Sequence, residues 1–142
     1  MKIVILLTFI CVTGSFAQQS TNMENEAIKG VINNFFLSLE KQDTILMQST
    51  LYPEGQVWTL RHMADSTVPR MRFFKDDFKG FDPKMKFLET PLSFDIKGHQ
   101  GMAVAWVPYT FHINDKFSHC GVDIFTLMKK ENDWKISRKG IS

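Results

Sequence analysis

The chain of 142 residues is 44% hydrophobic and 23% charged. This composition suits one soluble globular domain with a packed core and excludes a disordered or coiled-coil protein. Thirteen Phe and three Trp stand against two Tyr, so the aromatic side chains are mostly apolar, as in a large core or the wall of an apolar cavity. The net charge of +2 is too small for the basic surface that nucleic-acid binding requires, and we expect no nucleic-acid partner.

The first 17 residues have the pattern of a secretory signal peptide. Lys2 precedes an apolar run at 3–12, and Ser15 and Ala17 are small residues at positions −3 and −1 of a cut before Gln18. The run is shorter than the roughly 20 apolar residues that cross a bilayer. We therefore expect residues 1–17 to be cleaved, leaving a single domain, residues 18–142, that is exported to the periplasm or beyond and does not insert into the membrane.

Cleavage would leave one cysteine, Cys120, so no disulfide can form within the chain. Val122 and Ile124 lie on the same side of an extended segment as Cys120. We therefore expect the thiol to be buried.

Three helices are expected in the first part of the mature chain. Thr21–Glu24 fits a capping box, and the apolar residues that follow recur at spacings of three and four, which predicts a helix that ends near Gln42. Asp43 would cap a second, shorter helix, which ends at Tyr52-Pro53. After a turn at 53–55 and a strand at 57–62, a third helix is expected from Pro69 to Gly80.

Four strand-rich runs fill the rest of the chain: 85–96, 102–113, 117–129 and 134–141. Short links rich in Gly, Asn and Asp join them, which predicts antiparallel hairpins. The order of elements indicates an α+β fold, in which three N-terminal helices pack on one strongly bent antiparallel sheet. The helices would leave one end of the inner face uncovered, and this end is a candidate pocket.

Several stretches resemble a known family. They are Phe35-Phe36 through Asp43, Leu51-Tyr52-Pro53-Glu54, Ala105 through Phe111, His119 through Leu127, and Trp134-Lys135-Ile136. Together with the order of elements, they resemble the NTF2-like superfamily of cone-shaped domains, in particular its small secreted bacterial SnoaL-like or lumazine-binding-like members. The resemblance covers nearly all of the mature chain. It implies isomerases, dehydratases, cyclases or proteins with a ligand pocket alone, and a homodimer formed by the outer face of the sheet.

The chain departs from the isomerases of that superfamily at one position. Their base is a carboxylate on the first strand after the second helix, and this strand carries Trp58 and Leu60 instead. The departure argues against an isomerase of the steroid type.

His119 and Asp123 are the first candidates for chemistry. Four residues apart on a strand, they share a face with Gly121, and we expect both to line the pocket. Four residues of strand span about 13 Å, so the two side chains cannot bond to each other unless a bulge intervenes. Each would then either pair with a neighbouring polar group or act on a ligand.

Trp58, Trp106 and Tyr109 are expected around the cavity, with Trp134 left in a structural role. Pro108 suggests a bulge or an edge next to Tyr109, so two registers stay open. A tight Asn114-Asp115 turn would set Trp106 opposite Asp123. A three-residue loop would set Tyr109 opposite Gly121, where its ring can cover the missing side chain.

The remaining residues give no evidence for a metal or a cofactor. His62, His99 and His112 lack the spacings of metal ligands, and no glycine-rich phosphate loop or nucleophile motif is present. We expect a pocket that binds a small, mostly apolar or aromatic molecule. The alternative is a SnoaL-like isomerase or dehydratase that uses Asp123 or His119 for proton transfer.

Overall fold

The computed structural model describes the backbone of residues 13–142 and the side chains of residues 22–142. Most of the predicted signal peptide, residues 1–12, lies outside the described residues. The elements, in chain order, are α1 (Thr13–Lys41), α2 (Thr44–Thr50), β1 (Leu51–His62), β2 (Thr67–Phe73), α3 (Phe74–Asp77), β3 (Phe87–Pro91), β4 (Asp95–His99), β5 (Met102–Ile113), β6 (Lys116–Lys130) and β7 (Asp133–Ile141). No described helix is long and apolar enough to span a membrane.

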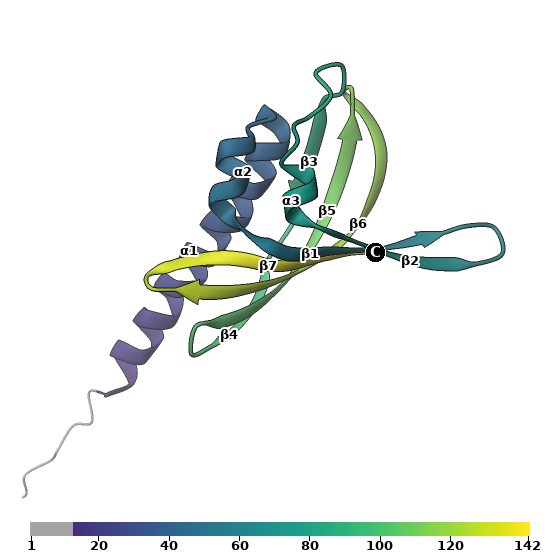
Figure 1. The fold of residues 1–142 in the computed structure, drawn as a ribbon. Helices are drawn as coiled ribbons and strands as arrows, with labels where there is room; N and C mark the ends of the chain where they lie inside the picture. The colour runs from purple at the N-terminus through teal and green to yellow at the C-terminus, as the bar shows by residue number, and fades with distance from the viewer. Residues whose placement is uncertain (1–12) are drawn as a thin grey trace, which may run out of the picture.

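One seven-stranded sheet has the order β2-β1-β7-β6-β5-β3, and β4 also pairs with β5. It curves around the helices, which lie on its concave side (Figure 1). Every pair is antiparallel except β1 with β7, which is parallel. The expectation of a wholly antiparallel sheet is therefore wrong at this one pair. A parallel pair needs a long connection, and here the whole chain between β1 and β7 provides it.

The first two helices form where the sequence predicts them, with two differences: α1 starts earlier than expected, and α2 ends at Thr50, so that Tyr52 and Pro53 lie in β1. Asp43 caps α2, because its Oδ1 accepts hydrogen bonds from the backbone N–H groups of Ile45 and Leu46 at 3.0 and 2.9 Å. The helix α1 is already formed at Thr13, so Thr21 is not its N-cap. The residues before Thr21 include Ala and Gln, which favour helix and extend it upstream.

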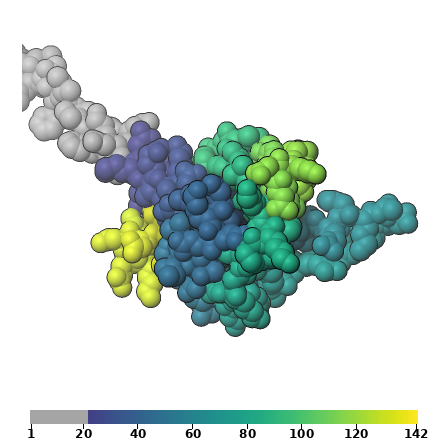
Figure 2. Space-filling view, turned by 90° about the horizontal axis from the view of Figure 1, so that it is seen from above, coloured from purple at the N-terminus to yellow at the C-terminus, as the bar shows by residue number. Residues whose placement is uncertain are grey.

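The predicted third helix is largely a strand. Residues 67–73 form β2, which pairs with β1 through Trp58 and Met71 and through Leu60 and Pro69, and only Phe74–Asp77 is helical. β2 is an edge strand, where Pro69 need not donate to a neighbour. The β1–β2 hairpin projects from the body of the molecule (Figures 1 and 2). The turn expected at 53–55 lies inside β1, where the register against β7 shifts.

The C-terminal strands agree closely with the prediction. β5 has the expected bounds, and β6 and β7 differ from theirs by one residue at some ends. The run at 85–96 is divided into β3 and β4, which pair with different parts of β5. Asn114 and Asp115 form the turn between β5 and β6 with φ of 51° and 63°, as in a two-residue hairpin.

The core lies between α1 and the inner face of the sheet. Phe35 and Phe36 of α1 both pack edge-on against Phe125 of β6, with ring centroids 5.9 and 5.8 Å away. Opposite these rings β5 carries Ala103 and Ala105, both buried. Trp134 is buried in the same core, in keeping with its expected structural role. The core closes one end of the cone and leaves a cavity at the other.

Candidate functional site

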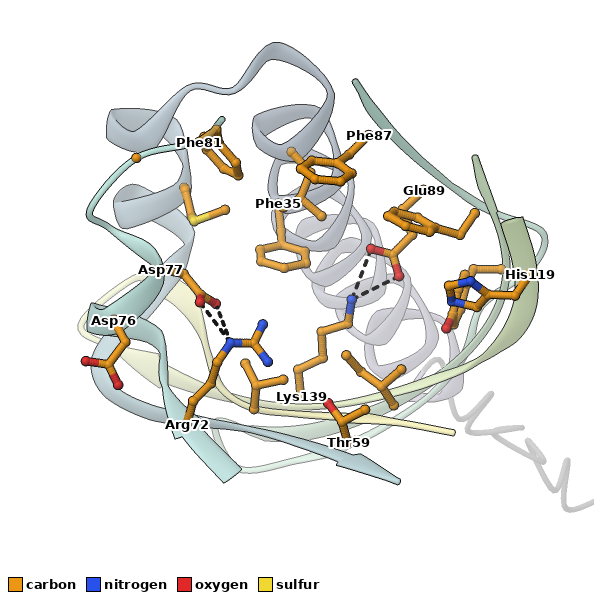
Figure 3. A pocket seen from close by; sticks show the side chains of 17 residues that line it. Phe35, Thr59, Arg72, Asp76, Asp77, Phe81, Phe87, Glu89, His119 and Lys139 are labelled. Carbon is orange, nitrogen blue, oxygen red and sulfur yellow. Dashed lines mark hydrogen bonds and ion pairs between the residues drawn. The ribbon is translucent and has the colours of Figure 1, made fainter. Parts of the chain in front are cut away.

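A cavity of about 470 Å³ lies between the helices and the inner face of the sheet (Figure 3). This volume is in the usual range for small-molecule sites. Its apolar wall comes from α1, α2, the segment after α3, and strands β3 and β5, and includes Phe35, Met47, Phe81, Phe87 and Phe111. The rings of Phe87 and Phe111 are stacked, with centroids 5.9 Å apart and planes 14° from parallel. The shape and lining suit a flat, largely apolar molecule.

The floor of the cavity holds a buried ion triad. The ammonium of Lys139 on β7 lies 3.0 and 3.1 Å from the two carboxylate oxygens of Glu89 on β3 and 2.8 Å from Oδ2 of Asp123 on β6. All three residues are buried. Glu89 and Lys139 line the cavity, whereas Asp123 lies behind them. Neither Asp123 oxygen has a hydrogen bond of good geometry within the described residues, and the Lys139 ammonium is the polar group in close contact with this carboxyl.

The charges of this triad depend on one another. Burial raises the pKa of Asp123 from 3.8 to about 8; the attraction of Lys139 opposes the rise, and the Glu89 carboxylate adds to it. Burial would lower the pKa of Lys139, but Glu89 and Asp123 together raise it above 10.5. At neutral pH the floor therefore holds a cationic Lys139 in contact with an Asp123 that is mostly protonated.

Tyr109 of β5 lies beside the triad. Its partner across the sheet is Gly121, and its hydroxyl fills the space that a Cβ there would occupy, 2.9 Å from the ideal Cβ position. Burial, followed by repulsion from Asp123 and Glu89, raises the pKa of Tyr109 to about 12. The phenol stays protonated and donates no hydrogen bond to the described residues, so it remains a donor on the cavity wall.

Two further polar groups lie at the rim. Arg72 at the end of β2 binds Asp77 of α3, with Nε 2.8 and 3.1 Å from the two carboxylate oxygens. His119 of β6 lies on the opposite wall (Figure 3). Its ring contacts Phe111 and Tyr109 at 5.1 and 5.9 Å between centroids, and its Nδ1 is 3.0 Å from the Ser118 hydroxyl.

The structure separates the five predicted site residues. Tyr109 and His119 line the cavity. Asp123 is on the same face of β6 but beneath the cavity floor, in contact with Lys139. Trp58 and Trp106 lie on the outer face of the sheet, 42% and 49% exposed, and their expected place in the cavity wall is wrong.

The register explains why Trp106 points outward. The pairing of β5 with β6 runs without a shift through Pro108. Trp106 and Tyr109 are three residues apart, so they face opposite sides of the strand. The turn at Asn114-Asp115 is tight, yet Tyr109 faces Gly121, because a shift in register between Phe111 and His112 takes up one residue.

Cys120 is exposed, not buried as expected. Its neighbours Val122 and Ile124 do share its side of β6, but that side is the outer face of the sheet, where Ile124 is 38% exposed. The inner face of β6 is formed by the alternate residues, among them Asp123 and Phe125.

Glu89, Lys139 and Arg72 were not singled out from the sequence. Trp134 and Ile136 are buried, and simple alternation would turn Arg138 inward and Lys139 outward. A register shift between β6 and β7 at this point reverses the alternation and buries Lys139. Glu89 is two residues from Phe87 on β3, so the two side chains share a strand face. This alternation can be read from the sequence. Arg72 lies in the segment that the sequence assigned to a helix.

In the part of the chain that the structure describes, no group of three or more His, Cys, Asp or Glu side chains is arranged to hold a metal ion. The polar groups of the cavity are those of acid–base chemistry and hydrogen bonding, supplied by a carboxylate, an ammonium, a guanidinium, an imidazole and a phenol.

Solved structures show which fold this is. A nuclear transport factor 2 (NTF2-like) superfamily protein from Salmonella enterica has a TM-score of 0.67 at 20% identity, over 86% of this chain and 92% of that one. An NTF2-like protein with a cystatin-like fold from Novosphingobium aromaticivorans has a TM-score of 0.69 at 11% identity, over 94% and 90% of the two chains. A putative scytalone dehydratase from Novosphingobium aromaticivorans has a TM-score of 0.62 at 11% identity, over 87% and 86%.

No family model and no curated protein matches the chain in sequence. The structural likeness is extensive, and it shows that the α+β cone is the NTF2-like fold. At these identities the likeness concerns the fold alone.

Proposed function

We propose that this protein binds a small, mostly apolar or aromatic molecule in the cone cavity. The observation that carries the proposal is the cavity of about 470 Å³ with the stacked pair Phe87 and Phe111 in its wall and polar groups at its floor and rim. Aromatic walls supply affinity, and a few polar groups fix the orientation of the molecule. A binding protein needs no more than this.

A neutral fluorescent naphthylamine probe tests the proposal. The probe should bind wild-type protein, and Phe87→Ala, which removes half of the stacked pair, should weaken binding about tenfold or more. Phe117→Ala is the matched control, because Phe117 is 61% exposed and does not line the cavity. Native mass spectrometry of the purified protein would show a co-purified ligand directly. Equal binding by both variants would contradict the proposal.

The second candidate is an enzyme of the isomerase or dehydratase type, and the burial pattern favours Glu89 and His119 over Asp123 as the groups that act. Both line the cavity, whereas Asp123 is shielded from it. A proton-transfer group must reach the substrate. One structural neighbour is described as a putative scytalone dehydratase, so the fold is compatible with such a role.

Turnover and binding of two variants would distinguish an enzyme from a binding protein. Loss of a general acid or base cuts turnover by about 100-fold or more and leaves binding nearly unchanged. Glu89→Gln and His119→Gln should then convert a bound ligand slowly but still bind it. For a binding protein, the same variants would change affinity by about 1–2 kcal/mol and have no turnover to lose.

We also propose that the protein is exported after removal of residues 1–17. The basis is the sequence pattern before Gln18. Mass spectrometry of the exported fraction should find Gln18, or its cyclised form, as the first residue. An intact Met1 in that fraction would refute export by cleavage at this position.

We further propose a homodimer formed by the outer face of the sheet. Neighbouring strands place Met71, Trp58, Ile124 and Trp106 in one row on this face, with Gly140 between Trp58 and Ile124. These four apolar side chains are 38–49% exposed. An exposed apolar patch of this kind marks an interaction site, and a second copy would cover it with a matching patch.

A further inference from the structure

The guanidinium of Arg72 enters the cavity with most of its hydrogen-bonding capacity unused. Asp77 binds Nε with both oxygens, and the other four N–H donors make no hydrogen bond within the described residues. Figure 3 shows the terminal nitrogens turned toward the middle of the cavity and Asp77 on the far side. The ion pair thus fixes the orientation of Arg72. It leaves the two terminal nitrogens, which form the fork of the guanidinium, open to a ligand.

The other charged groups of the cavity are already engaged. Lys139 is held by Glu89 and Asp123 and surrounded by four aromatic rings at 5.0–6.0 Å from its ammonium to their centroids. Asp76 accepts a hydrogen bond from the backbone N–H of Phe73 at 3.3 Å, and its side chain points away from the guanidinium (Figure 3). Open cationic donors are therefore found at the Arg72 end of the cavity.

The space between Arg72 at one end of the cavity and Lys139 at the other suits one aromatic ring. Arg72 pairs with Val57, and Val57 pairs with Lys139, so Arg72 and Lys139 are two strands apart, about 10 Å between Cα atoms. Phe35, Phe87 and Phe111 form the wall beside this space. An open guanidinium fork matches the two oxygens of a carboxylate.

From the open fork of Arg72 and the aromatic wall beside it, we propose that the ligand is an aromatic carboxylate, bound with its carboxylate on the terminal nitrogens of Arg72 and its ring among the three Phe side chains. This inference rests on the proposed binding function and names its ligand class. It also makes Arg72 the residue that selects acids over neutral compounds of the same shape.

Calorimetric titration with trans-cinnamate and with cinnamamide, its neutral isostere, tests the inference. The acid should bind wild-type protein about tenfold or more tightly than the amide. Arg72→Gln should remove this preference, because the affinity for the acid should fall much more than the affinity for the amide or for the neutral naphthylamine probe. Arg72→Lys, which keeps the charge but loses the fork, should retain part of the preference.

Arg70→Gln is the matched control, because Arg70 is on the same strand, carries the same charge and does not line the cavity. Its preference for the acid should equal that of wild type. Equal binding of acid and amide, or no binding of the acid while the naphthylamine probe binds, would overturn the ligand class and leave the proposed function standing. No binding of any of the three compounds would overturn both.

Discussion

The ammonium of Lys139 lies between the two buried carboxyl groups of Glu89 and Asp123 at the floor of the cavity. A buried ion pair is costly to form, and removing one partner is costlier because it leaves uncompensated charge behind. The triad therefore sets both the electrostatics of the cavity and the stability of the strands that carry it, β3, β6 and β7.

Replacing Lys139 by Met should lower the free energy of unfolding by about 3–5 kcal/mol, measured by urea denaturation at pH 7. Glu89→Gln added to Lys139→Met should restore part of the loss, since it removes the unpaired charge. Lys97→Met is the control. Its ammonium is exposed and 3.8 Å from Asp95, and its removal should barely change stability. A Lys139→Met protein as stable as wild type would contradict the role given to the triad.

The raised pKa of Asp123 predicts a pH dependence of stability. Because burial raises this pKa from 3.8 to about 8, the folded protein keeps a proton that the unfolded chain loses between pH 4 and 8. The free energy of unfolding should fall as pH rises through this window and level off above about pH 8.

Asp123→Asn does not titrate and isolates this effect. The stability of the variant relative to wild type should rise steadily from pH 5 to pH 8 in a series of urea denaturation curves. A difference that is the same at every pH in this window would mean that Asp123 is ionised in the folded protein.

Strand β6 depends on the absence of a side chain at Gly121. A Cβ there would overlap the carbonyl oxygen of Ser142 and lie 2.9 Å from the hydroxyl of Tyr109. Gly121→Ala must displace either the end of the chain or the ring that lines the cavity. We expect a loss of about 1–3 kcal/mol in stability, measured by thermal denaturation.

Gly30→Ala in α1 is the matched comparison. Gly30 is exposed and nothing lies within 4 Å of its added Cβ, so the change should stabilise the protein by about 0.5–1 kcal/mol through helix propensity. If Gly121→Ala and Gly30→Ala changed the stability in the same direction, the packing described around Gly121 would be contradicted.

The assembly of two copies through the outer face is tested by changing its apolar row. Wild-type protein at micromolar concentration should scatter light as a dimer, and Trp106→Asp, which replaces the most exposed ring of the row by a charge at its β5 end, should scatter as a folded monomer. Phe117→Asp changes an exposed ring outside the row and should remain dimeric. A monomeric wild-type protein would refute the proposed homodimer.

Local chemistry was enough to predict the helices that depend on it. The spacing of Ile28, Ile32 and Phe35 defines one helix face, and Asp43 satisfies free N–H groups within its own turn. The turn at Asn114-Asp115 likewise needs only two residues that tolerate positive φ. The order of these local elements predicted an α+β fold, and the resemblance to the NTF2-like superfamily also needed the stretches of sequence that carry it.

Pairing between distant strands decided the rest. The pattern at 69–78 fits a helix face, yet residues 67–73 form a strand because β1 offers an open edge. Strand side chains alternate with a period of two, so a shift of one residue exchanges the two faces. Such a shift turned Lys139 into the cavity, and its absence at Pro108 turned Trp106 out of it. The fold class was therefore readable from neighbouring residues, whereas the cavity was set by the registers of strands far apart in the chain.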